Sequence, residues 1–155
     1  MAALKDRLRG DLTEAMKARD EVRTRTLRMA LTSITREEVA GQSARELTDD
    51  EVIGVLTREA KRRREAAEAF AAAGRDEQAA AERAEGVILD GYLPAQLSDE
   101  ELAAMVADVI DETGASGMAA MGQVMRALTP RVAGRADGAR VAAEARRRLS
   151  GERRP

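Results

Sequence analysis

The chain has 155 residues, of which 44% are hydrophobic and 35% are charged, and its formal net charge is −2 at pH 7. It contains no His and no Cys, which excludes disulfides, thiolate nucleophiles, His acid–base catalysis and zinc sites built on either residue. No apolar run approaches the roughly 20 residues that cross a bilayer, and no segment resembles a secretory h-region, so we expect a cytoplasmic protein without a membrane segment.

Helix-forming residues dominate the sequence, and no segment alternates apolar and polar residues as strands do. Apolar residues at three- and four-residue spacing predict a first amphipathic helix over residues 4–16, and Asp20 is placed to cap a second helix. Thr48 and Glu51 carry the signature of a capping box, in which side chain and backbone satisfy each other's polar groups. A third helix should therefore run from this box to about Ala73.

The fourth predicted helix follows a stop at Gly74. Its expected apolar side consists of Ala80, Ala84, Val87, Ile88 and Tyr92. Gly86 within this helix costs about 1 kcal/mol relative to Ala, which close approach of a neighbouring helix would offset. Pro94 disfavours the helical conformation at Leu93, so we expect the helix to end there and a linker to occupy residues 94–97.

Three further helices are expected over residues 98–150. Ser98 and Glu101 form a second capping box, and Asp137 is placed to cap the last helix. Residues 151–155 should form a frayed tail.

The sequence therefore predicts an all-α protein with two parts. An N-terminal domain of about four helices occupies residues 1–93, and a small three-helix C-terminal domain occupies residues 98–150. The chain has one Tyr, one Phe and no Trp, so small aliphatic side chains must fill both interiors. The smaller domain is near the size at which a lone hydrophobic core is marginal.

Positive charge is concentrated near the C-terminus. Residues 122–155 carry nine Arg against three acidic residues, a net charge of +6, whereas residues 95–121 carry six acidic residues and no base. Such a basic segment attracts polyanions, although the same side chains can simply solvate a helix. The candidate nucleic-acid-binding residues are Arg126, Arg131, Arg135, Arg140, Arg146 and Arg147. A secondary group, in a helix whose acidic neighbours at i,i+4 spacing can neutralise it, comprises Lys61, Arg62 and Arg64.

No catalytic constellation is present in the sequence. The five serines have neither a base partner nor a Gly-x-Ser-x-Gly elbow, and no Gly-rich loop ends in Gly-Lys-Ser/Thr. Acidic clusters at 49–51 and 99–101 open helices, where carboxylates favour the positive end of the helix dipole, so we assign them to capping. We expect no catalytic residue, no metal and no cofactor. With so few aromatic side chains, any RNA contact would be to phosphates and shape.

Three motifs together carry a resemblance to a known family: Tyr92-Leu93-Pro94-Ala95-Gln96-Leu97-Ser98, Met121-Gly122-Gln123-Val124-Met125 and Gly134-Arg135-Ala136-Asp137-Gly138. With the Arg28-Met29 pair and the Ala72-Ala73-Gly74-Arg75-Asp76 turn, they make the chain resemble the YqeY-like family over about residues 1–150. That family is similar to the tail region of the B subunit of tRNA-dependent amidotransferases.

The resemblance implies an all-helical protein with a larger N-terminal part and a small C-terminal part. In the amidotransferase, the related tail helps to hold misacylated Glu-tRNA(Gln) or Asp-tRNA(Asn) while ammonia from glutamine amidates it, and the catalytic machinery lies in other domains and subunits. The resemblance thus implies a non-catalytic module that binds tRNA or an aminoacyl-tRNA-handling enzyme complex. Two alternatives stay open: a protein–protein interaction module that docks on an enzyme, and an accessory subunit of a carbon–nitrogen ligase with glutamine as amido-N-donor.

Overall fold

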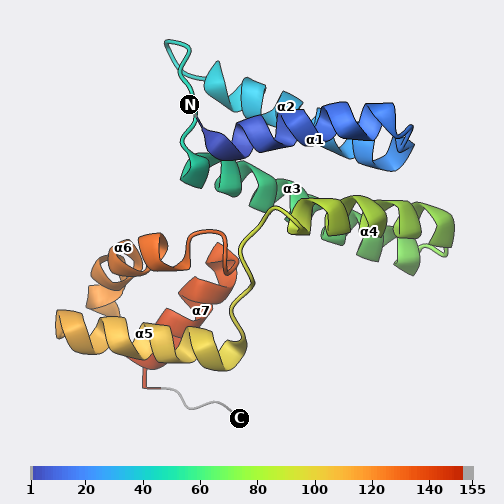
Figure 1. Cartoon of the computed structure of the whole chain (residues 1–155). Coiled ribbons are helices and arrows are strands. Elements are labelled where there is room, and N and C mark those ends of the chain that lie inside the picture. The colour runs from blue at the N-terminus through green and yellow to red at the C-terminus, as the bar shows by residue number, and fades with distance from the viewer. Residues whose placement is uncertain (1, 152–155) are drawn as a thin grey trace. The chain divides into compact units, whose positions relative to one another are not determined.

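A computed structural model describes residues 2–151 and confirms the all-α class. Within those residues no strand is present, and the elements in chain order are α1 (Ala3–Lys17), α2 (Glu21–Glu38), α3 (Asp49–Ala72), α4 (Asp76–Asp90), α5 (Asp99–Thr113), the 3-10 helix η1 (Met118–Ala120), α6 (Met121–Val132) and α7 (Gly138–Leu149). Contacts divide the chain into two units, Met1–Leu93 and Pro94–Pro155 (Figure 1). Independent folding of two domains stays a prediction. Of the expected frayed tail, residues 152–155 lie outside the described residues.

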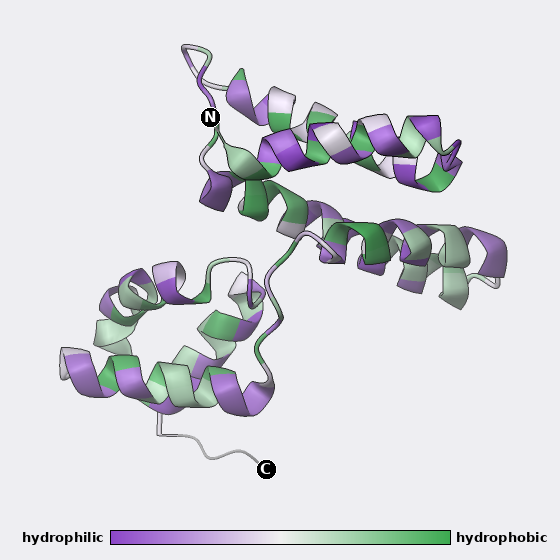
Figure 2. Ribbon diagram, in the orientation of Figure 1, coloured by the Kyte–Doolittle hydropathy of each residue, from purple (hydrophilic) through white to green (hydrophobic). Residues whose placement is uncertain are grey.

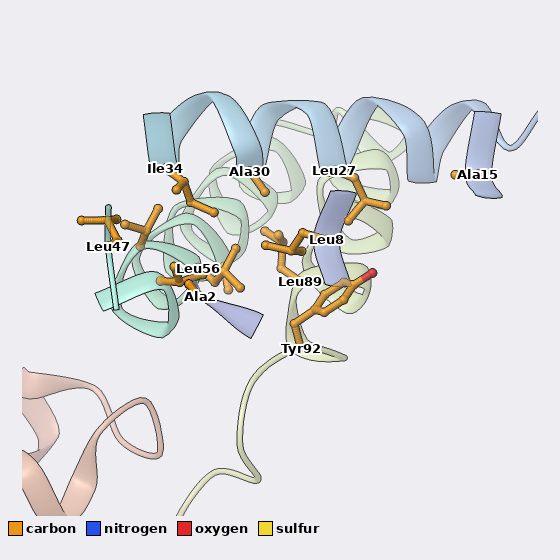
Figure 3. Packing of buried hydrophobic residues seen from close by; sticks show 13 residues of the cluster. Ala2, Leu8, Ala15, Leu27, Ala30, Ile34, Leu47, Leu56, Leu89 and Tyr92 are labelled. Atoms are coloured by element: carbon orange, nitrogen blue, oxygen red, sulfur yellow. The ribbon is translucent and has the colours of Figure 1, made fainter. Parts of the chain in front are cut away.

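The first unit consists of two helical hairpins, α1 with α2 and α3 with α4, which pack on each other (Figure 1). Its largest fully buried side chains are Leu8, Leu27, Ile34, Leu47, Leu56 and Leu89. Figure 3 shows that these leucines lie together with small residues such as Ala30 between the helices. Each helix carries hydrophilic and hydrophobic residues (Figure 2), as amphipathic helices around a core do.

A buried ion pair joins three segments of the first unit. The Lys5 ammonium of α1 donates to both carboxylate oxygens of Glu38 at the end of α2, over 2.7 and 2.9 Å. Both residues are buried, with 6% and 8% of their surface exposed. Glu38 Oε2 also accepts the Leu47 N–H at 3.2 Å, and the Glu38 carbonyl accepts the Arg45 N–H at 3.0 Å. The pair therefore fixes the loop before α3 as well as the contact between the first two helices.

The two predicted capping boxes form to different extents. At α5, Ser98 Oγ accepts the Glu101 N–H and Glu101 Oε1 accepts the Ser98 N–H, so the box is complete. At α3, Thr48 Oγ1 accepts the Glu51 N–H, but the Glu51 carboxylate pairs with the Arg45 guanidinium at 2.6 Å. The Arg45 guanidinium, a charged donor, has replaced the Thr48 backbone N–H as the donor to the Glu51 carboxylate.

The apolar side predicted for the fourth helix is correct only at its end, where Ile88 and Tyr92 belong to or pack against the core. The exposed positions of α4 include Ala80, Ala84 and Val87, and the buried ones are Ala79, Gly86 and Leu89. Val87 is the most exposed large apolar side chain of the helix, at 70%. The helix is therefore rotated about its axis relative to the prediction.

The side chain of Arg63 in α3 accounts for this rotation. Its guanidinium lies 3.1 Å from Glu85 and 3.6 Å from Glu82 of α4, and 3.4 Å from Glu59 of its own helix. A Cβ built on Gly86 would meet the Arg63 Cβ at 3.8 Å, so the two helices are in contact there. Only 15% of the Arg63 side chain is exposed, and a guanidinium in such a position needs these carboxylates. They bring the Glu82–Glu85 side of α4 against α3.

The second unit is built around a separate core. Its most buried side chains are Val106, Val109, Val124, Leu128, Val141 and Ala145. Leu97 also belongs to this core, and its N–H donates to the Arg135 carbonyl at 2.7 Å. Gln96 Nε2 donates to the Gly134 carbonyl at 2.8 Å. The end of the segment that we expected as a linker, residues 94–97, is therefore held against the loop between α6 and α7.

We predict that Glu38→Gln lowers the free energy of unfolding by about 3 kcal/mol, because it leaves the Lys5 ammonium buried without a counter-charge. Urea denaturation followed by circular dichroism measures the loss. Glu37→Gln is the matched control, since Glu37 is exposed and lies 3.8 Å from an exposed Arg58, a pair that contributes little. Equal and small effects of the two variants would contradict a stabilising role of the buried pair.

The same pair should make stability depend on pH. The hydrogen bond from Lys5 holds the pKa of the Glu38 carboxyl below its ordinary value of 4.5. A carboxyl with a lowered pKa in the folded state stabilises the fold above its unfolded pKa, and this contribution is lost as pH falls through the folded pKa. We expect the urea midpoint to fall below pH 4.5, and to fall less steeply in Glu38→Gln. Identical acid-side slopes in the two proteins would contradict this linkage.

Candidate nucleic-acid interface

The six arginines predicted to bind nucleic acid all lie in the second unit, on α6, on α7 and in the loop between them. The structure separates them into two sets. Those that contact other groups of the chain are Arg131, Arg135, Arg140 and Arg147. The other two, Arg126 and Arg146, are exposed and have no side-chain partner among residues 2–151.

Arg131 joins α6 to α5. Its guanidinium forms a two-armed ion pair with the Glu112 carboxylate, one arm of which measures 3.4 Å. The hydrogen bond that Arg131 donates to Glu112 raises the pKa of the Arg131 guanidinium above its ordinary value. Both side chains are more than 40% exposed, so water and salt screen the pair, and it contributes little to stability.

The motif residue Arg135 and Arg140 of α7 hold the entry segment of the second unit. Arg140 donates to the Leu97 carbonyl at 3.1 Å and to Asp99 Oδ1 at 2.9 Å. Arg135 Nε donates to the Ala95 carbonyl at 3.4 Å. These contacts satisfy backbone carbonyls outside any helix, so the two side chains have a role in the fold. The sequence had indicated contact with a polyanion or simple solvation for these arginines, and neither expectation included this structural role.

A buried carboxylate forms ion pairs with arginines at the basic end of α7. Glu144 is 6% exposed and accepts from Arg147 through both arms of the guanidinium, with Nε at 3.1 Å. Arg148 Nε lies 3.5 Å from the same carboxylate. The cluster of three arginines at the end of this helix is therefore partly neutralised by a residue one turn earlier. Arg146 is the member that has no contact with the Glu144 carboxylate.

Arg146 lines an open hollow between η1 and α7 with a volume of about 440 Å³. The lining residues are Met118, Ala143, Arg146, Arg147 and Ser150, and none of them is acidic. Met118 is 45% exposed and lines the hollow together with the two arginines. The hollow thus combines positive charge with a small apolar area.

The secondary basic group on α3 is neutralised within the first unit. Arg62 donates to Glu59 at 3.3 Å, and Arg64 lies 3.8 Å from Asp90 of α4. Lys61 has an interaction partner as well. The sequence had indicated acidic neighbours at i,i+4 spacing as partners, but packing of α4 on α3 gives Arg64 a partner from the next helix.

The motif residue Tyr92 is an anchor of the first unit. It is 6% exposed, its hydroxyl donates to Asp11 Oδ2 at 2.5 Å and accepts from Arg23 at 3.1 Å, and the Arg7 guanidinium lies 4.7 Å above the ring centroid. Burial, and next the hydrogen bond to Asp11, raise the pKa of the Tyr92 phenol to about 12. The phenol is neutral at physiological pH, and its contacts with α1 and α2 position the chain at the end of α4.

The acidic clusters serve helix ends, as the sequence indicates. Asp49 Oδ1, for example, accepts the Leu4 N–H at 3.1 Å. Across residues 2–151, acidic side chains do not gather in groups that hold a metal ion. No helix in that range has both the length and the apolarity needed to span a bilayer.

A family model described as Yqey-like protein matches residues 5–149, which include all seven helices in whole or in part. The chain belongs to the YqeY-like family. The match confirms the resemblance carried by the three motifs and extends over both units and all six candidate arginines. No curated protein matches the sequence significantly.

We predict that Glu144→Gln increases the retention of this YqeY-like protein on heparin, because it releases Arg147 and Arg148 from their counter-charge. The salt concentration at elution measures the change. Glu68→Gln alters the net charge equally at an exposed position of α3 and is the matched control. Elution of both variants at the same salt concentration would show that the end of α7 is not an anion-receptive surface.

Proposed function

We propose that this YqeY-like protein is a non-catalytic helical module that binds tRNA through its phosphates, using the second unit. The observation that carries the proposal is the pair Arg126 and Arg146, two exposed guanidinium groups on α6 and α7 without partners in the described chain. An unpaired Arg keeps its planar set of donors available and can grip a phosphate through two of them. Membership of the family supports the assignment to an RNA-associated helical module.

Contact with phosphates agrees better with the structure than contact with bases. The Tyr92 ring is buried, and Phe70 on α3 is only partly exposed. Single-stranded bases need exposed aromatic faces for stacking, and neither side chain offers one. Binding should therefore follow the shape and charge of a folded RNA, and its affinity should fall steeply as salt rises.

The remaining arginines would contribute unequally. Arg131 is held by an exposed pair with Glu112 that salt and water weaken, so a phosphate can displace the carboxylate. Arg135 and Arg140 bond the backbone of residues 95–97, and their transfer to RNA would release that segment. We therefore expect the RNA contact to centre on Arg126, Arg131 and Arg146.

A second candidate function is a protein-interaction module. The exposed Met118 in the hollow beside α7 favours it, because an apolar side chain at the surface gains from burial against a protein more than from proximity to a phosphate. The acidic first turn of α5 also repels a polyanion laid across it. A partner protein recovered after nuclease treatment, together with no tRNA binding, would support this candidate.

We predict that Arg126→Glu combined with Arg146→Glu weakens binding to total tRNA by about tenfold or more, and reduces the slope of log affinity against log salt by about 2. A filter-binding assay at two salt concentrations measures both. Arg75→Glu with Arg83→Glu makes the same charge change at exposed, unpartnered positions of the first unit and is the control. All variants should keep the circular dichroism spectrum of the parent.

Two results would contradict the proposal. If the test pair and the control pair weaken binding equally, only overall charge matters and the second unit holds no interface. If the parent protein binds no tRNA at low salt, the RNA-binding function itself is wrong.

A further inference from the structure

The first unit has an open pocket between α1 and α2 that the proposed function does not use. Its volume is about 420 Å³, and its lining residues are Lys5, Arg9, Leu31, Thr32, Thr35 and Arg36. Three of these side chains are cationic, two carry hydroxyl groups and none is a carboxylate. The chemistry of this lining suits an anion.

The positions of these residues follow from the antiparallel pairing of the two helices. Lys5 and Arg9 are one turn apart on α1, and Thr32, Thr35 and Arg36 occupy neighbouring turns of α2, so each set shares one side of its helix. The two sides meet where the start of the first helix packs against the end of the second. Donors from two elements therefore surround one space.

The Lys5 ammonium is fixed by its buried contact with Glu38. The Nζ atom contacts both oxygens of that carboxylate, and an ammonium with three N–H groups has donor capacity for a further acceptor. The side chain is 6% exposed, so its position depends on packing rather than on solvent. The pocket therefore has a cation held in place at its wall, which favours an anion in the space beside it.

Two arginines at the same pocket are available to a ligand. Arg36 has no ion pair or side-chain hydrogen bond within the described residues, and neither has the Thr35 hydroxyl. Arg9 lies 3.9 Å from Asp6, and both of these side chains are more than half exposed, so this contact is weak. The nearest buried carboxylate, Glu38, is already compensated by Lys5.

We propose that this pocket binds a phosphate group. The guanidinium groups of Arg9 and Arg36 would grip its oxygens from the open side, with Thr35 and the third N–H of Lys5 donating from the helices. Leu31 is the single large apolar side chain of the lining, and no aromatic ring is present in it, so the site selects the anion and not a nucleoside attached to it. The proposal concerns the first unit and is independent of RNA binding by the second.

The test uses the full-length protein and inorganic phosphate, then tripolyphosphate, in calorimetric titrations against chloride of matched ionic strength. We expect saturable binding that falls about tenfold or more in Arg9→Gln combined with Arg36→Gln. Arg75→Gln combined with Arg83→Gln removes the same charge from exposed sites on or beside α4 and should bind as the parent does. Neither pair removes the Lys5–Glu38 contact, so both variants should fold, which circular dichroism verifies.

The outcome distinguishes two sources of the phosphate. If it belongs to RNA, the Arg9/Arg36 variant also loses tRNA affinity and inorganic phosphate competes with tRNA. If it belongs to a free small molecule, tRNA affinity is unchanged while phosphate binding is lost. Absence of saturable phosphate binding, or equal loss in the control pair, overturns the proposal. Either result leaves the Arg126/Arg146 test of RNA binding unaffected, so the two ideas fail separately.

Discussion

The buried contact between the Lys5 ammonium and the Glu38 carboxylate is the constraint on which the first unit depends. It joins α1 to α2 and, through the Leu47 N–H, sets where the chain enters α3. A core made largely of Leu, Val and Ala can pack in several helix registers at similar cost. A buried charge pair, in contrast, satisfies its hydrogen bonds in one arrangement of the helices alone. The same contact presents a cation to the pocket between the first two helices, so one interaction serves both the fold and a candidate site.

The arginines of the second unit illustrate how a charge pattern along the sequence differs from charge at the surface. Residues 94–155 carry nine Arg and nine acidic residues, so the segment as a whole is neutral. The partners are far apart in sequence, with Glu112 and Arg131 separated by 19 positions and Asp99 and Arg140 by 41. Helix packing brings them together, and it leaves a smaller set of available guanidinium groups than the basic segment suggests.

Features that depend on neighbouring residues could be predicted from the sequence, and features that depend on packing could not. The Ser98 box and the Asp137 cap need only a few consecutive residues, and both are present. The exposure of Val87 was not predictable, because carboxylates of α4 pair with the partly buried Arg63 of α3 and set the rotation of α4. For the site, residue type and family resemblance indicated the basic unit, but which arginines are engaged depends on contacts between helices.

The anchoring of Tyr92 has a spectroscopic consequence. The chain has one Tyr and no Trp, so its tyrosine emission comes from a single phenol within the first unit. In the native state that hydroxyl donates to Asp11, and a carboxylate acceptor quenches tyrosine fluorescence. Brightening on denaturation should therefore report the loss of the contact between Asp11 of α1 and Tyr92 in the first unit, whereas far-ultraviolet ellipticity reports every helix. Comparing the two signals reveals whether both halves of the polypeptide melt in a single cooperative event or in succession.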